Sequence, residues 1–216
     1  MSRTTQDIVL NDTEREKRYE KNWFFVGTIV VVAINLLLYF VVSPAVNVGA
    51  RVWYGFVNFD AILQAFLNAF GHLSLQHVLL NMLCFLVCGI YLERKIGTLR
   101  LLFMVFVLAF FTSLATTANS LGLGWRGFSG VNYALYFFIL VDYVFLCFQK
   151  DVRSRGKLIL GGVVLALIFV AMCYKGDADG FAMTWYPYDL LNNMGHYSSA
   201  LVGIIFAFVV KLFKKC

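Results

Sequence analysis

Charged side chains are scarce in this chain. Only 14% of its 216 residues are Asp, Glu, Lys or Arg, whereas 61% are hydrophobic. A soluble domain of this length has too small an interior to bury so large an apolar fraction. The shortage of charge therefore excludes an ordinary soluble domain and indicates a protein of the lipid bilayer.

Long uncharged runs account for most of the sequence. A helix needs about 20 predominantly apolar residues to cross the hydrocarbon core of a membrane. Six runs of about that length are present, at 23–42, 73–92, 99–118, 129–148, 158–174 and 190–210, and the fourth includes Asp142. Strands of an outer-membrane barrel would alternate polar and apolar residues, whereas these runs are apolar on all sides. We therefore expect an all-α, polytopic membrane protein built as a bundle of six transmembrane helices.

Patterns that bind metals or phosphates are also missing. The three histidines are not part of an HExxH pattern or a cluster with cysteines and carboxylates, so no metal site is expected. We find no Gly-rich phosphate loop and expect no cofactor. The five cysteines are odd in number and lie mostly in apolar runs, which argues against a disulfide framework.

Basic residues are unevenly distributed among the segments outside the apolar runs. Of the 18 Lys and Arg residues, 15 lie in the N-terminal tail, the second and fourth connections and the C-terminal tail. Because cytoplasmic segments are enriched in Lys and Arg, both termini are predicted in the cytoplasm, and a bacterial plasma membrane fits the compact form. The net charge of +6 is thus a signal of topology and gives no reason to expect nucleic acid.

The chain shows no internal repeat or low-complexity segment, so we expect one domain. Residues 1–22 are predicted to form a cytoplasmic tail, residues 23–211 the six-helix domain and residues 212–216 a second tail. The first apolar run is too long for the hydrophobic region of a signal peptide, so its helix should be retained. Two aromatic outer connections, 43–71 and 175–189, are expected at the membrane interface; the second is equally compatible with a mobile apolar cap.

A few polar side chains lie inside the apolar runs, where each needs a partner or a purpose. His77 and Asn81 are four residues apart in the second run and so share a helix face. Ser129 opens the fourth run, and His196 lies early in the sixth. The predicted orientation puts all four at the outer ends of their helices, where they can meet. A serine and a histidine at one depth are the minimum for nucleophilic catalysis.

The surroundings of Ser129 favour negative charge. Gly127 and Gly130 flank it, and the first N–H groups of a helix have no partner within the helix, which suits a developing oxyanion. His77 and Asn81 of the second run would add side-chain donors to the same oxygen. Asp142 lies 13 residues beyond Ser129, or about 20 Å along a helix, so no carboxylate is assigned to the pair.

Each of these residues also has a purely structural interpretation. A serine in a membrane helix often only bonds a backbone carbonyl or allows close packing, and Ser199 with Gly203 has the spacing of a packing motif. His77 and Asn81 could form a polar clasp between helices. His72 precedes the second helix and could be a residue of the membrane interface.

Taken together, these residues resemble the signature of the rhomboid family of intramembrane serine proteases. The stretch that begins at His72 resembles the family's HxxxxHxxxN pattern, 93–97 resembles its ExxxG pattern, and 127–130 matches its GxSG pattern. His196 stands where the family has its sixth-helix histidine. The resemblance covers roughly residues 68–203, with the motifs in the family's order.

The resemblance implies a role for each residue of the site. Ser129 would be the nucleophile, His196 the general base and acid, and Tyr133 the stacking partner of His196. The oxyanion donors would be His77, Asn81 and the Ser129 amide. Three further residues would support the site: Gly127, Gly130 and His72.

The resemblance also implies a water-filled cavity open to the outer face. The substrate would be a single-pass membrane protein, and the lipid bilayer would surround both proteins. Neither nucleic acid nor metal is expected as a partner. The substrate would approach sideways, near the fifth helix and 175–189, and a turn of its helix must open before a peptide bond can be attacked. The alternative is a rhomboid-like pseudoprotease, which binds transmembrane helices for quality control or trafficking without cutting them. A channel or transporter would show a charged pathway or repeated halves, and we find neither.

Two positions depart from the family's pattern. A Trp-Arg pair is usual in the first outer connection, where this chain has Gln64 and Ala65. A glycine is common three residues after the sixth-helix histidine, where this chain has Ser199. We expect this serine to loosen packing between the fourth and sixth helices.

Overall fold

The computed structural model describes residues 25–42, 66–72, 74–119, 127–148, 155–177, 180–183 and 190–213. Within these ranges the chain forms six helices of 17 to 24 residues: α2 (Val26–Val42), α4 (Leu75–Ile96), α5 (Thr98–Asn119), α6 (Ser129–Cys147), α7 (Arg155–Cys173) and α8 (Leu190–Phe213). The predicted tail 1–22, most of the outer connection 43–71, the Gln64-Ala65 pair and the end of the second tail lie outside the described residues.

The segment after α7 forms a short antiparallel hairpin, which departs from the all-helical prediction. β1 (Tyr174–Asp177) pairs with β2 (Gly180–Met183), and β1 contacts α4 and α7. Two residues separate the strands, the commonest length for a hairpin connection. The all-α description therefore holds for the bundle and not for this connection. Residues 184–189 lie outside the described ranges, so the interfacial and cap interpretations both stay predictions.

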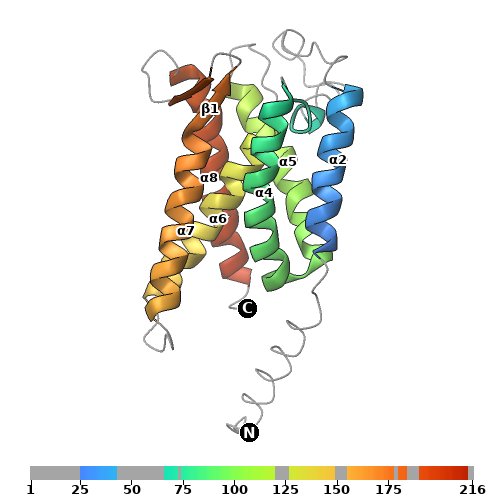
Figure 1. Cartoon of the computed structure of the whole chain (residues 1–216). Coiled ribbons are helices and arrows are strands. Elements are labelled where there is room, and N and C mark those ends of the chain that lie inside the picture. The colour runs from blue at the N-terminus through green and yellow to red at the C-terminus, as the bar shows by residue number, and fades with distance from the viewer. Residues whose placement is uncertain are drawn as a thin grey trace, which may run out of the picture.

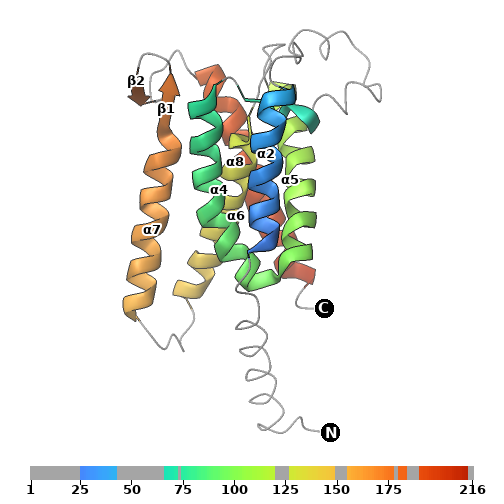
Figure 2. The same cartoon turned by 45° about the vertical axis from the view of Figure 1, so that its right-hand side comes forward.

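The helices pack side by side in alternating directions (Figure 1). α4, α6 and α8 begin at the end that carries the hairpin, hereafter the hairpin end, whereas α2, α5 and α7 run the other way. α6 is central: it contacts α4, α5, α7 and α8, and residues 130–136 are all buried. α2 and α7 lie on opposite sides of α4 in both views (Figures 1 and 2).

The helices have the length and outer surface of membrane spans. α4, α6 and most of α5 and α8 are long and apolar enough to cross a bilayer, whereas the apolar parts of α2 and α7 fall short of that length. Large apolar side chains on the outer faces are exposed, including Leu37, Leu83, Phe103 and Leu167. Apolar surface on this scale marks contact with lipid. The chain is thus a multi-pass membrane protein, while the count of six spans and the sidedness stay predictions.

Glu93, buried near the end of α4, joins three helices. Its Oε1 accepts hydrogen bonds from the Gly27 N–H at 2.8 Å and the Thr98 hydroxyl at 2.6 Å. Its Oε2 accepts from the N–H and the hydroxyl of Thr28, at 2.8 and 2.7 Å. Four donors offset the cost of burying a carboxylate. Glu93 therefore ties α2 and the start of α5 to α4. Gly97 (φ +86°) makes the turn between α4 and α5.

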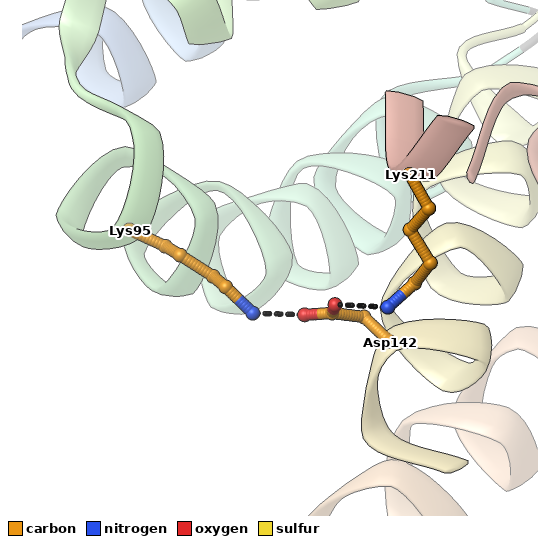
Figure 3. Close-up of polar contacts among 3 residues, drawn as sticks. All are labelled: Lys95, Asp142 and Lys211. Carbon is orange, nitrogen blue, oxygen red and sulfur yellow. Dashed lines mark hydrogen bonds and ion pairs between the residues drawn. The ribbon is translucent and has the colours of Figure 1, made fainter. Parts of the chain in front are cut away.

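Asp142 performs a similar task and lies between two lysine side chains (Figure 3). One carboxylate oxygen pairs with Lys95 in the last turn of α4, and the other accepts from Lys211 Nζ at 3.1 Å in the last turn of α8. Lys211 Nζ also lies 4.1 Å from the centre of the Phe145 ring. The one acidic residue in the apolar run of α6 thus has two cationic partners, and it holds together the far ends of α4, α6 and α8.

α6 and α8 make the most extensive helix contact of the described elements. Their closest approach is at Gly203 of α8, where a Cβ atom would lie 2.1 Å from the backbone oxygen of Ala134 and 2.7 Å from its Cα. Backbone atoms cannot turn aside as the end of a side chain can. Only a residue without a side chain therefore fits at this crossing.

Gly203→Ala is expected to destabilise the bundle, because the new methyl group forces α6 and α8 apart. Overpacking of this kind costs about 1–3 kcal/mol or more, and it should appear as a lower melting temperature of the detergent-solubilised protein. Gly156→Ala is the matched control, since a Cβ at that position meets no atom within 4 Å. Equal melting temperatures for the two variants would contradict the tight crossing.

Candidate active site

Ser129 and His196 lie within hydrogen-bond distance of each other. Ser129 is the first residue of α6, and His196 lies in the second turn of α8. His196 Nε2 and Ser129 Oγ are 3.1 Å apart, and both residues are partly buried. The parallel directions of α6 and α8 bring these residues, 67 positions apart in sequence, to one depth.

Tyr133 stacks on the imidazole ring. The ring centroids of Tyr133 and His196 are 4.4 Å apart and the planes differ by 14°. Tyr133 lies one turn after Ser129 and is itself largely buried. The same helix thus supplies the hydroxyl group and a flat surface that restricts rotation of the histidine ring.

Gly127 brings the chain before α6 close to α4. It has a φ of +130°, and its N–H donates to the carbonyl oxygen of Asn68 at 3.0 Å. A Cβ on Gly127 would lie 2.8 Å from His77 Cε1 and 3.6 Å from Asn81 Nδ2. The two polar side chains of α4 therefore lie directly against the segment that leads into Ser129.

The start of α6 has no side-chain cap. Phe128 occupies the N-cap position and its side chain makes no capping hydrogen bond. The first N–H groups of a helix have no acceptor within the helix, and the helix dipole makes this end electropositive. The backbone at Ser129 therefore suits a negatively charged oxygen.

His72 anchors the residue before the serine. Its Nε2 accepts a hydrogen bond from the Phe128 N–H at 3.3 Å, and its Nδ1 donates to the carbonyl oxygen of Phe70 at 3.1 Å. Burial, and next the neighbouring His77, lower the pKa of His72 to about 3, so its ring is neutral, as this bonding requires. With 1% of its surface exposed, His72 is buried within the protein.

His77 and Asn81 lie one turn apart at the start of α4. The His77 N–H donates to Ser74 Oγ, which caps the helix, at 3.1 Å. The buried Nδ2 of Asn81 has no hydrogen-bond partner among the described residues, whereas Oδ1 accepts a hydrogen bond from α6 at 3.2 Å. The side-chain oxygen of Asn81 thus links α4 to α6, while its side-chain nitrogen remains available to donate a hydrogen bond.

The match to a known family covers most of the chain. A family model described as Rhomboid domain matches residues 60–213. The chain belongs to the rhomboid family. Rhomboid protease GlpG of Salmonella choleraesuis (strain SC-B67) is 29% identical over 202 residues, which cover 91% of this chain and 65% of that protein. The proteins of the same name from Salmonella newport (strain SL254) and Salmonella heidelberg (strain SL476) are 28% identical over the same shares. This rhomboid chain therefore spans 65% of the length of these relatives.

Ser199, one of the two departures from the rhomboid pattern, is accommodated between α6 and α8. It is fully buried, and its hydroxyl donates to the Gly195 carbonyl at 2.8 Å. A Cβ on Gly130 would lie 3.0 Å from Ser199 Oγ. The two helices remain in close contact on either side of this serine, so the expected loosening is not seen.

One polar residue of this rhomboid site is absent from the prediction. Asn132 of α6 is the donor to Asn81 Oδ1. A strongly polar side chain in an apolar helix signals that a partner exists, but the sequence does not say which one. Within the described part of the chain, no group of three His, Cys, Asp or Glu residues is placed to hold a metal ion.

Gly127→Ala is expected to destabilise the protein more than Gly97→Ala. Both replacements force alanine into a backbone region that costs about 1–3 kcal/mol. A Cβ on Gly97 meets nothing within 4 Å, whereas one on Gly127 meets the His77 ring. The melting temperatures of the two variants measure the difference. A smaller loss for Gly127→Ala would show that the segment before α6 can move away from α4.

Proposed function

We propose that this rhomboid chain is an intramembrane serine endopeptidase. It hydrolyses peptide bonds in or near the transmembrane segments of single-pass membrane proteins by means of a Ser129–His196 dyad. The observation that carries the proposal is the 3.1 Å distance between Ser129 Oγ and His196 Nε2 at the start of α6. The similarity to proteins named rhomboid proteases supports it.

In the first half-reaction, His196 Nε2 accepts the hydroxyl proton of Ser129 while Oγ attacks the carbonyl carbon of the scissile bond. The carbonyl oxygen becomes an oxyanion near the Ser129 N–H, and Asn81 Nδ2 and His77 act as further donors. His196 then gives the proton to the leaving amine, and the C–N bond breaks. A water molecule hydrolyses the acyl-enzyme by the same steps, and its proton passes through His196 back to Ser129.

The remaining site residues hold this arrangement. The ring of Tyr133 stacks on the imidazole of His196 and restricts its rotation. Gly130 has no side chain and so leaves room for α8 beside Ser129. Gly127 and His72 fix the backbone that leads into α6. Neither a metal nor a cofactor is part of this mechanism.

The substrate is proposed to reach the site from the bilayer on the side of α7. This helix lies at the edge of the bundle in both views (Figures 1 and 2), and its main contacts are with α6, α4 and β1. Because every backbone group of a membrane helix is paired, the substrate must unwind locally before attack. We further propose cytoplasmic tails at 1–22 and 212–216 around the domain 23–211, which places the hairpin end outside, as in a bacterial plasma membrane.

Ser129→Ala and His196→Ala are each expected to lower turnover at least about 1,000-fold while the folded yield is retained. Covalent labelling of the detergent-solubilised protein by a fluorophosphonate probe measures the activated serine. Ser198→Ala is the matched control, since Ser198 Oγ bonds the Gly195 carbonyl at 3.0 Å and should label as the parent does. Parental labelling in Ser129→Ala would refute the dyad. No labelling of well-folded parent would instead favour a pseudoprotease that binds transmembrane helices.

A further inference from the structure

Asn132 links α6 to α4 beside the site. It lies one turn after Ser129, and 1% of its surface is exposed. Its Nδ2 donates one hydrogen bond to the backbone oxygen of Asn81 at 2.9 Å and a second to Asn81 Oδ1 at 3.2 Å. Both N–H bonds of one amide are therefore directed at a single residue of α4.

This geometry determines which way each amide group faces. A backbone carbonyl oxygen only accepts hydrogen bonds, so the nitrogen of Asn132, and not its oxygen, must lie against Asn81 O. The second N–H of the same nitrogen then requires an acceptor, and the Asn81 side chain must turn its oxygen toward Asn132. As a result Asn81 Nδ2 faces away from Asn132.

The freed nitrogen of Asn81 lies on the side of the proposed oxyanion. It is 3.6 Å from the point where a Cβ on Gly127 would be, two residues before Ser129. It is buried and has no partner among the described residues. A donor in this position is available to an oxygen that only the substrate brings.

A purely structural link between α4 and α6 does not account for the Asn81–Asn132 pair. Asn81 Nδ2 and Asn132 Oδ1 are both buried without a partner in the described part of the chain. Unpaired buried polar atoms destabilise a protein, and two apolar side chains of similar shape would avoid them. The arrangement is explained if the orientation of the amide has a use other than stability.

We propose that Asn132 is a positioning residue that fixes the orientation of the Asn81 amide, so that Nδ2 and not Oδ1 points at the developing oxyanion. The proposal rests on the protease function proposed above. With the amide reversed, the lone pairs of Oδ1 would face the negative oxygen and repel it. Asn132 thus acts on the reaction through Asn81 without touching the substrate.

Asn132→Asp is the sharpest test when labelling is measured at a pH at which the new carboxyl is ionised, because aspartate then has the shape of asparagine but no hydrogen to donate. Its oxygens attract Asn81 Nδ2 and reverse the amide. The maximal rate of fluorophosphonate labelling is expected to fall about 100-fold, the usual effect of losing an oxyanion donor, with little change in the half-saturating probe concentration. Asn132→Leu only releases the amide, so its loss should be smaller, about 10-fold.

A double-mutant cycle separates positioning from a general effect on structure. In an Asn81→Ala background, Asn132→Asp should change the labelling rate less than about 2-fold, because the group it positions is gone. A further 100-fold loss in that background would overturn the proposal. Asn35→Asp is the matched control: Asn35 is equally buried on α2 and donates to the Val31 carbonyl at 2.9 Å, and its variant should label at the parental rate.

An NMR measurement tests the orientation without relying on activity. The parent should show Overhauser contacts between the side-chain amide protons of Asn81 and the α protons of Gly127, and Asn132→Asp should lose them. Contacts that persist in the variant would overturn the proposal. If the well-folded parent keeps the contacts but is never labelled, the protease function fails while the orientation of Asn81 by Asn132 stands.

Discussion

The site depends on a close backbone contact between α6 and α8. At their crossing the α carbon of Gly203 lies against the backbone of Ala134, and no side chain separates the helices. Ala134 is five residues beyond Ser129, and Gly203 is seven beyond His196, which amounts to about 8 and 10 Å along parallel helix axes. The hydroxyl and the imidazole therefore emerge at nearly the same depth. A backbone contact fixes this relation more firmly than side chains would, because neither partner can change rotamer.

The two buried or half-buried carboxylates of the described helices both have structural partners. Glu93 accepts four hydrogen bonds that join α2, α4 and α5, and Asp142 pairs with lysines of α4 and α8. Because a bilayer offers no water to satisfy such groups, each must find its partner within the protein. Four buried side-chain atoms have no partner among the described residues, and Asn81 Nδ2 is the one donor among them; the others are the side-chain oxygens of Asn35, Asn68 and Asn132. Under the proposed mechanism, this donor is available to the oxyanion of the reaction.

The sequence predicts the helices well because apolar length alone decides whether a segment can lie in a membrane. The bounds of α4, α5, α6 and α8 lie within four residues of the predicted spans, and their alternating directions predict the shared depth of Ser129 and His196. Helix rotation cannot be predicted in this way, because it depends on which neighbours fill which grooves. For this reason the Asn132–Asn81 contact emerges only from the structure. The burial of His72 does so too, because this residue precedes α4 and no helical pattern orients it. The hairpin after α7 likewise cannot be predicted from the apolar runs, since it depends on local strand pairing and not on apolar periodicity.

The first turns of α6 concentrate the site on one helix face. Ser129, Asn132 and Tyr133 occupy positions i, i+3 and i+4, which point the same way on a helix. One rigid element thus carries the proposed nucleophile, the group that orients Asn81 and the surface that stacks on His196. A small movement of α6 shifts these three together and leaves their mutual geometry intact. The positions of α4 and α8 relative to α6 are the sensitive ones, and each is set by a contact with α6: the Asn132–Asn81 hydrogen bonds for α4 and the Gly203–Ala134 crossing for α8. The precision of this site therefore depends mainly on how the helices pack against one another, while Gly127 and His72 fix the backbone that leads into α6.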